Sequence, residues 1–277
     1  MPFLSFVGYQ LRWQLLRKRW LLPIPLVMFL AYRGINYLTQ SSIYTPEMVG
    51  VNAWDLLLLT FGNRLNVYFV FGLLFLYLVS DLLPETNLGQ LVLFRLKSRT
   101  AWWLGKTLTL LILTLVLVLG SAGLLTGFAS LALPWEAGYS QQATLMPESV
   151  NLPMGYYTTE PLAPPFVFLS QELALLVLGL FAFGLLMLVV NQLTGRYYYG
   201  LLAGGVVLFG SLVSTYLSGP PPWVKWLPGT HLTYLAMLPV RTIPLWFSFT
   251  YWGVWILIFW LVGLFISRRQ DYSSSQE

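Results

Sequence analysis

Cysteine is absent from this 277-residue chain, and histidine occurs once, at His231. These absences exclude a disulfide framework and a thiolate metal site, and they argue against a histidine-based metal centre. Charged residues are also scarce, at 9% of the chain, whereas a soluble domain carries about 25%. Because 57% of the residues are hydrophobic, the composition predicts a polytopic membrane protein.

Sequence motifs of common enzyme active sites are missing as well. The sequence has no P-loop GxxxxGK[ST], no HExxH and no GxSxG. We therefore predict that this chain is not an enzyme and holds no catalytic residue, metal or cofactor of its own. Ionisable groups at membrane depth are few, namely Arg33, Asp81 and Glu172, whereas ion-coupled carriers usually need several. Glu172 is either satisfied by its neighbours or a polar contact in a substrate path or subunit interface.

Hydrophobic periodicity divides the chain into an all-α arrangement. Residues 1–19 predict an amphipathic elbow helix, because apolar residues recur at helical spacing among cations; the alternative is a plain basic anchor. A transmembrane domain follows over residues 20–266, and a cytoplasmic tail over 267–277. Its six spans are expected at about residues 20–38, 67–83, 102–133, 166–193, 197–217 and 247–266. Residues 120–127 give the third span small residues, which predict close helix packing.

Two further segments are too short to cross a hydrocarbon core. The apolar residues 51–62, within the outer segment 39–66, predict a helix that lies at the outer surface or dips back into it. The residues HLTYLAMLP, 231–239 within the proline-rich stretch 218–246, predict a second short outer or re-entrant helix. With both termini inside, eleven Lys and Arg residues fall on inner segments and three on outer loops, as the positive-inside rule requires. The net charge of +5 is thus a topology signal, and no nucleic-acid partner is expected.

The inner segment 84–106 carries a second cluster of positive charge. Four cations fall within twelve residues, at Arg95, Lys97, Arg99 and Lys106. Leu88, Leu91 and Val92, with Phe94 beside them, supply an apolar face that a protein cleft could accept. We interpret the segment as a docking surface for a soluble partner, and Ser98 or Thr100 as the N-cap of the next helix. The alternative is that the charges only reflect the topology rule.

This ordered set of features resembles a known family. An elbow helix comes first, then two spans, then the run R-x-K-S-R-x-x-x-x-L-G-K from Arg95 to Lys106, and a proline-rich outer hairpin precedes the last span. Nearly the whole chain is similar to the permease subunit of an ABC-2 type ATP-binding cassette exporter. The outer segments 39–66 and 134–165 are longer than a minimal member needs, which points to a peptide, lipid, lipid-linked or drug-like cargo.

The resemblance implies a partner set and a set of site residues. Two permeases, either identical or two paralogues, would form the translocation pathway. They would lie in the plasma membrane, of bacterial type, in contact with membrane lipids. Two separate ATPase subunits would bind ATP and Mg, and would dock on the cytoplasmic face. The implied docking residues are Leu91, Phe94, Arg95, Lys97, Ser98, Arg99 and Lys106. The candidate pathway or interface residues are Tyr68, Phe71, Phe75 and Tyr216, with Glu172.

Two other functions stay open on the sequence alone. A membrane-embedded enzyme acting on lipids would need polar groups such as His231 and Glu172 to converge at an interface. A sensor or scaffold that pairs with an ATPase without transport would carry the same docking segment. The sequence does not distinguish the cargo, the direction of transport, or a homodimer from a heterodimer.

Overall fold

The described part of the chain is all-helical, as predicted. The computed structural model describes residues 3–44, 50–83, 96, 98–141, 143, 163–215, 222–233 and 244–269. These residues form helices and connecting segments, and no strand occurs among them. Five of the predicted site residues lie outside this part of the chain: Leu91, Phe94, Arg95, Lys97 and Tyr216.

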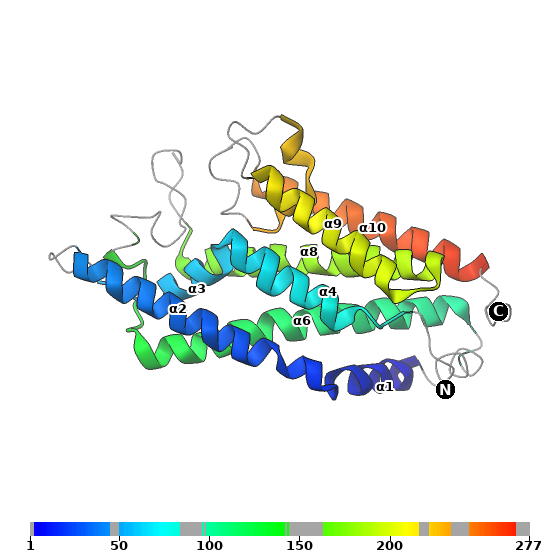
Figure 1. Cartoon of the computed structure of the whole chain (residues 1–277), viewed down its shortest axis with the longest axis horizontal. Helices are drawn as coiled ribbons and strands as arrows, with labels where there is room; N and C mark the ends of the chain where they lie inside the picture. Colours follow the sequence, from blue (N-terminus) through cyan, green and yellow to red (C-terminus); the bar gives the residue numbers. More distant parts are fainter. Residues whose placement is uncertain are drawn as a thin grey trace.

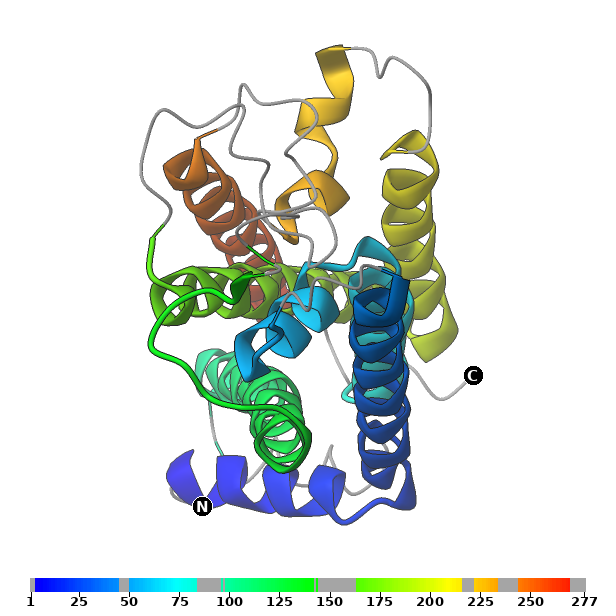
Figure 2. The ribbon, with the colours of Figure 1, turned by 90° about the vertical axis from the view of Figure 1, so that its left-hand side faces the viewer.

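The helices form one elongated bundle (Figure 1). The α-helices are α1 (Phe3–Leu15), α2 (Pro23–Tyr44), α3 (Ala53–Gly62), α4 (Leu74–Val79), α6 (Arg99–Ala132), α8 (Pro165–Thr194), α9 (Tyr197–Thr215) and α10 (Leu245–Arg269). The 3₁₀-helices are η1 (Lys18–Leu21), η5 (Pro222–Trp226) and η6 (Pro228–His231), and η2 (Asn66–Leu73) is a π-helix. The longest helices run along the bundle, whereas α1 lies across it beneath α2 and α6 (Figure 2).

Among the described residues, four helices are long and apolar enough to cross a membrane. They cover Lys18–Thr39, Arg99–Ala132, Pro165–Thr194 and Leu245–Arg269. A fifth crossing results if Ala53–Gly62 and Asn66–Val79, which meet at a bend of 74°, are one broken span. Helix α9 has a shorter apolar stretch, Tyr197–Leu212. A multi-pass membrane protein with four or five such spans is therefore supported, and the sixth span stays a prediction.

Helix α3 begins at a complete capping box. The Asn52 side chain accepts from the Trp54 amide at 3.0 Å, and Asp55 accepts from the Asn52 amide at 2.8 Å. Asn52 also donates to the Gly138 carbonyl at 3.1 Å, and the Trp54 indole donates to the Glu136 carbonyl at 2.9 Å. The loop after α6 thus binds the start of α3, and a helix too short to span lies buried among its neighbours.

The bend after α3 leads directly into a π-helix. Asn66 donates its side-chain amide to the Thr60 carbonyl at 3.2 Å, and Asn63 accepts from the Asn66 amide. These bonds satisfy backbone groups that the interrupted helix leaves open. The wider turn of a π-helix is rare and often marks functional positions. The second predicted span, residues 67–83, is thus built as η2 followed by α4.

Helix α8 is the central element, since α6, α9 and α10 all pack on it. Glycines allow some of these close approaches. A Cβ added at Gly184 would lie 2.7 Å from Leu110 of α6, and one added at Gly263 of α10 would overlap the Trp103 ring. Gly195, at φ 69°, ends α8 in the left-handed conformation and starts the tight turn into α9.

The glycines predicted to pack closely in α6 do not do so in this chain. Nothing lies within 4 Å of a Cβ added at Gly120, Gly123 or Gly127, and these positions are exposed. The helix instead approaches its neighbours through Gly105, where an added Cβ would overlap Phe6 of α1. The prediction of close packing is therefore wrong for these three glycines within the single chain, whereas Ser121 of the same stretch is buried and Ala122 packs against the core.

Candidate functional site

The ends of several helices meet around residues Ser80–Leu83, directly after α4 and before the cationic segment. We call these four residues, with the side chains of Arg17, Arg19, Lys106 and Asn191 that bind them, the inner junction. The word inner follows the predicted orientation. Helix α1 and the C-terminal end of α10 lie at this same end of the bundle (Figure 1).

Lys106 binds the inner junction from α6. Its Nζ donates to the Leu82 carbonyl at 2.9 Å and lies 5.8 Å from the centre of the Trp102 ring. The residue is only 3% exposed. A cation near the C-terminal end of a helix satisfies carbonyls that have no partner within the helix. Lys106, predicted as a docking cation, therefore holds the start of the loop within this chain and does not present its charge at the surface.

Asn191 binds the same residues from α8. Its Nδ2 donates to the Leu83 carbonyl at 3.1 Å and to the Ser80 carbonyl at 3.4 Å, and its Oδ1 accepts from the Gly200 amide at 2.9 Å. Asn191 is fully buried. One amide therefore joins the end of α4 to the start of α9. The sequence analysis missed this residue, although a polar Asn-Gln pair at the end of a long apolar run was a usable signal.

Asp81 brings the elbow region to the junction. It forms ion pairs with Arg17 and Arg19, which lie between α1 and α2. Gln14 of α1 donates to the same carboxylate at 3.3 Å and accepts from Arg19 at 2.7 Å. These groups are partly buried, so their charges are screened less than those of a surface pair. The elbow helix and the inner end of the second span are thus joined through one carboxylate.

The far end of the cationic segment is held by α6 and α10. Ser98 caps α6 by accepting from the Ala101 amide at 3.2 Å, which confirms one of the two N-caps considered from the sequence. Arg99 donates to the Arg268 carbonyl at the end of α10 at 2.9 Å. Both ends of the segment are therefore joined to the bundle, the first through α6, α8 and the elbow region and the second through α10. The docking role of the segment stays a prediction.

The candidate pathway residues of the second span lie inside the chain. Tyr68 and Phe71 are on η2, Phe75 is on α4, and all three are at most 1% exposed. Phe71 stacks on Phe61 of α3 with ring centres 5.1 Å apart, and a Cβ added at Gly229 of η6 would overlap the Tyr68 hydroxyl. Because the chain's own helices cover these rings, a pathway role would require α3, α9 or η6 to move.

The outward face of the same span carries other residues. Leu65, Phe69, Leu73 and Tyr77 recur every four positions, and each is more than a third exposed. The sequence analysis missed this stripe, because the direction in which a uniformly apolar helix faces depends on its neighbours. Glu172, the other candidate, lies on α8 and is 2% exposed. A buried acid in a span indicates a polar contact within the bundle.

His231 serves as a contact between η6 and α10. Its Nε2 lies 2.8 Å from the Lys225 carbonyl, which can only accept, so Nε2 carries the proton. Its Nδ1 lies 3.0 Å from the Ser248 hydroxyl, and its ring stacks on Tyr251 at 4.0 Å. Burial lowers the pKa of His231 to about 4. The imidazole is therefore neutral at pH 7 and both of its nitrogens are engaged within the chain.

An apolar groove lies between α9 and α10. It has a volume of about 260 Å³ and is lined by Ala182, Phe183, Leu186, Val207, Pro228, Trp252, Trp255 and Phe259. Helix α8 contributes Ala182, Phe183 and Leu186 to its lining, and η6 contributes Pro228. No charged side chain lines it, so it suits an uncharged ring or hydrocarbon chain.

No group of three His, Asp or Glu side chains that could hold a metal ion occurs in the described ranges. Comparison with known proteins adds no relative. No protein-family model matches the chain, and neither a curated protein nor a solved structure matches it.

Proposed function

We propose that this chain is the membrane-spanning permease subunit of an ABC exporter of the ABC-2 type. It would form the translocation pathway as a dimer and would be driven by two separate ATPase subunits. The observation that carries the proposal is the inner junction. A cationic segment whose two ends are bound to the elbow region, α6, α8 and α10 is a place from which a soluble partner could move the bundle.

The six-span topology belongs to the same proposal. Helix α9 has 19 residues, and at about 1.5 Å per residue it is about 28 Å long, close to the thickness of a hydrocarbon core. Counting α9 and the bent pair as one span each gives six crossings, which returns both termini to the cytoplasmic side. Attaching a reporter enzyme after Ser218 and after Thr194 tests this topology, because the two sites should report opposite sides.

The docking surface is tested by reversing charge in the segment. Arg95→Glu with Lys97→Glu should abolish co-purification of the ATPase and nucleotide-dependent transport, while the permease still inserts in the membrane. These two positions avoid Arg99, whose side chain binds the Arg268 carbonyl. A matched control is Arg268→Glu with Arg269→Glu, which makes the same charge change at the same end of the bundle. Unchanged co-purification in the first variant, or equal loss in the control, would contradict the proposal.

The dimer interface is the second part of the proposal. Gly72 of η2 packs on Leu208 of α9, and the neighbouring outward faces of the two helices expose Phe69 and Val206. We assign this joint face to the second permease. Because the chain contains no cysteine, a single introduced cysteine is a clean probe. Phe69→Cys should give disulfide-linked dimers, whereas Leu261→Cys on the exposed face of α10 should not; the reverse result would place the interface elsewhere.

A further inference from the structure

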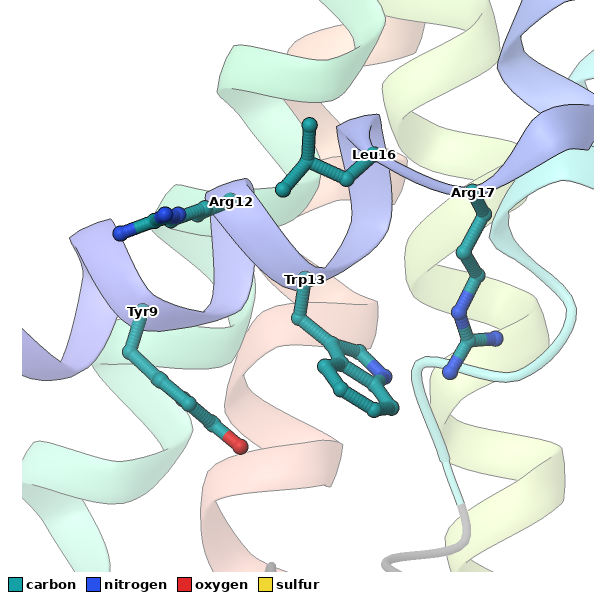
Figure 3. A pocket seen from close by; sticks show the side chains of 5 residues that line it. All are labelled: Tyr9, Arg12, Trp13, Leu16 and Arg17. Atoms are coloured by element: carbon teal, nitrogen blue, oxygen red, sulfur yellow. The ribbon is translucent and has the colours of Figure 1, made fainter.

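A cavity lies on the exposed face of the elbow helix. It has a volume of about 380 Å³ and is lined by Tyr9, Arg12, Trp13, Leu16 and Arg17 (Figure 3). Helix α1 packs on α6 through Phe6, whereas Tyr9, Trp13 and Leu16 are exposed, so the cavity is open at the surface of the bundle. Tyr9 and Trp13 point to the same side of the helix, and the Arg17 side chain lies beyond Trp13 (Figure 3).

The chemistry of the cavity is cationic and aromatic. The Arg17 guanidinium lies 5.4 Å from the centre of the Trp13 ring, and Arg12 comes from the same helix one turn before Leu16. No Asp or Glu occurs in the sequence before Glu47, but Asp81 of the inner junction forms an ion pair with Arg17, so the Arg17 charge is already paired. Guanidinium groups bind phosphate oxygens with two parallel hydrogen bonds, and Trp and Tyr side chains are enriched at the level of lipid headgroups.

The position of α1 places this cavity at the membrane boundary. Helix α1 ends at Leu15, and the first candidate span begins at Lys18. The helix lies across the bundle and not along it (Figure 2). A helix that lies flat directly before a span is at the depth of the headgroups. On the predicted inner side, that depth holds the phosphates of anionic lipids.

We propose that this cavity binds the headgroup of an anionic phospholipid. Arg12 binds the phosphate, Tyr9 and Trp13 contact the glycerol region, and Leu16 contacts the start of an acyl chain. Arg17 lies at the other end of the cavity from Arg12 (Figure 3). Arg17 also forms an ion pair with Asp81 of the inner junction. The bound headgroup therefore lies next to the residue that joins the elbow to the start of the cationic segment. This inference does not depend on the transport proposal, since it needs only the helix and the membrane.

The test is lipid binding by the full chain purified in detergent. Phosphatidylglycerol should remain bound in native mass spectrometry and raise the unfolding temperature, and phosphatidylcholine with the same acyl chains should do neither. Each cation near an anionic membrane surface contributes about 1 kcal/mol, so Arg12→Gln should weaken phosphatidylglycerol binding about fivefold. Trp13→Leu should weaken it as well. Neither change removes the ion pair with Asp81.

The matched control is Arg269→Gln, which loses one charge at the same end of the bundle and should leave lipid binding unchanged. Equal weakening in the control would mean unspecific attraction and would overturn the proposal. Equal binding of the two lipids would also overturn it, as would displacement of the lipid by millimolar inorganic phosphate. If Arg12→Gln lost the ATPase partner but kept the lipid, the cavity would be a protein contact, and the lipid assignment would be wrong.

Discussion

Asn191 gives the sharpest test of the inner junction. The variant Asn191→Leu keeps the γ-branched shape of the side chain but removes three hydrogen bonds, two to carbonyls of the α4 end and one from the Gly200 amide. In membrane bundles such bonds average about 0.6 kcal/mol and reach about 1.7 kcal/mol. Because this site is fully buried and the partner groups stay behind unpaired, we expect a loss of about 2–3 kcal/mol.

The expected readout is thermal unfolding of the purified chain in one fixed detergent. At about 2–4 °C per kcal/mol for chains of this order of size, the midpoint should fall by about 5–10 °C. Gly200→Ala should produce a similar loss, because the new Cβ would lie 2.6 Å from the Met187 carbonyl and overlap the Asn191 amide. Since both changes break the same contact, the double variant should be little worse than Gly200→Ala alone.

The surface substitution Thr194→Val, three residues further along α8, is the control and should leave the midpoint within about 1 °C. The reasoning fails if Asn191→Leu behaves like this control. It also fails if the fall in the unfolding midpoint of the double variant equals the sum of the falls in Asn191→Leu and Gly200→Ala. Additive effects would mean that the two residues do not share one hydrogen-bonded contact.

Three further predictions concern single contacts. Gly263→Ala should lower the unfolding midpoint because its Cβ would overlap the Trp103 ring, whereas Gly253→Ala on the same helix has nothing within 4 Å and should not; equal effects would refute the packing. The pKa of His231 falls from 6.5 in the unfolded chain to about 4 in the folded one, so the unfolded chain binds a proton more readily. The contribution of His231 to folding stability is therefore complete above pH 6.5 and is lost as the pH falls towards 4. Unfolding midpoints measured from pH 7 to pH 4 check this, and the variant His231→Gln, which does not titrate, should show a flatter pH dependence. Asp81→Asn should lower the folding stability by at most about 1 kcal/mol, because the ion pairs are partly exposed. In the proposed permease it should nevertheless reduce the coupling of ATP hydrolysis to transport. Unaltered coupling in a transport assay would refute the link between the elbow helix and the cationic segment.

Apolar runs and capping residues, which are visible in the sequence itself, predicted much of the helical architecture. The uninterrupted apolar runs predicted helices close to α6, α8 and α10, because length and hydrophobicity alone determine that a segment becomes helical in a bilayer. Ser98 was one of two caps considered for α6, since its side chain can bond the first free amides of a helix. Such features depend on neighbours in the sequence and are visible without the fold.

The long-range contacts were not visible in the same way. The 74° bend and the π-helix depend on side-chain bonds from Asn63 and Asn66 to a broken helix, and no pattern of period 3.6 reveals them. Counting charges placed Lys106 among the docking cations, yet it binds a carbonyl at the end of α4. A cation that faces a partner and one that satisfies a helix end look alike in sequence, because the difference lies in what packs beside them.

The inner junction has a mechanical consequence. Lys106, Asn191, Asp81 and Arg99 connect the elbow region and the ends of α4, α6, α8, α9 and α10 at one level of the bundle. A displacement of the cationic segment would therefore move these helix ends together as one rigid body and would not move a single helix independently. The opposite ends, joined there by longer connections, would make the larger excursion. If the chain is the proposed permease, the opening for cargo would form at the end of the bundle opposite the cationic segment.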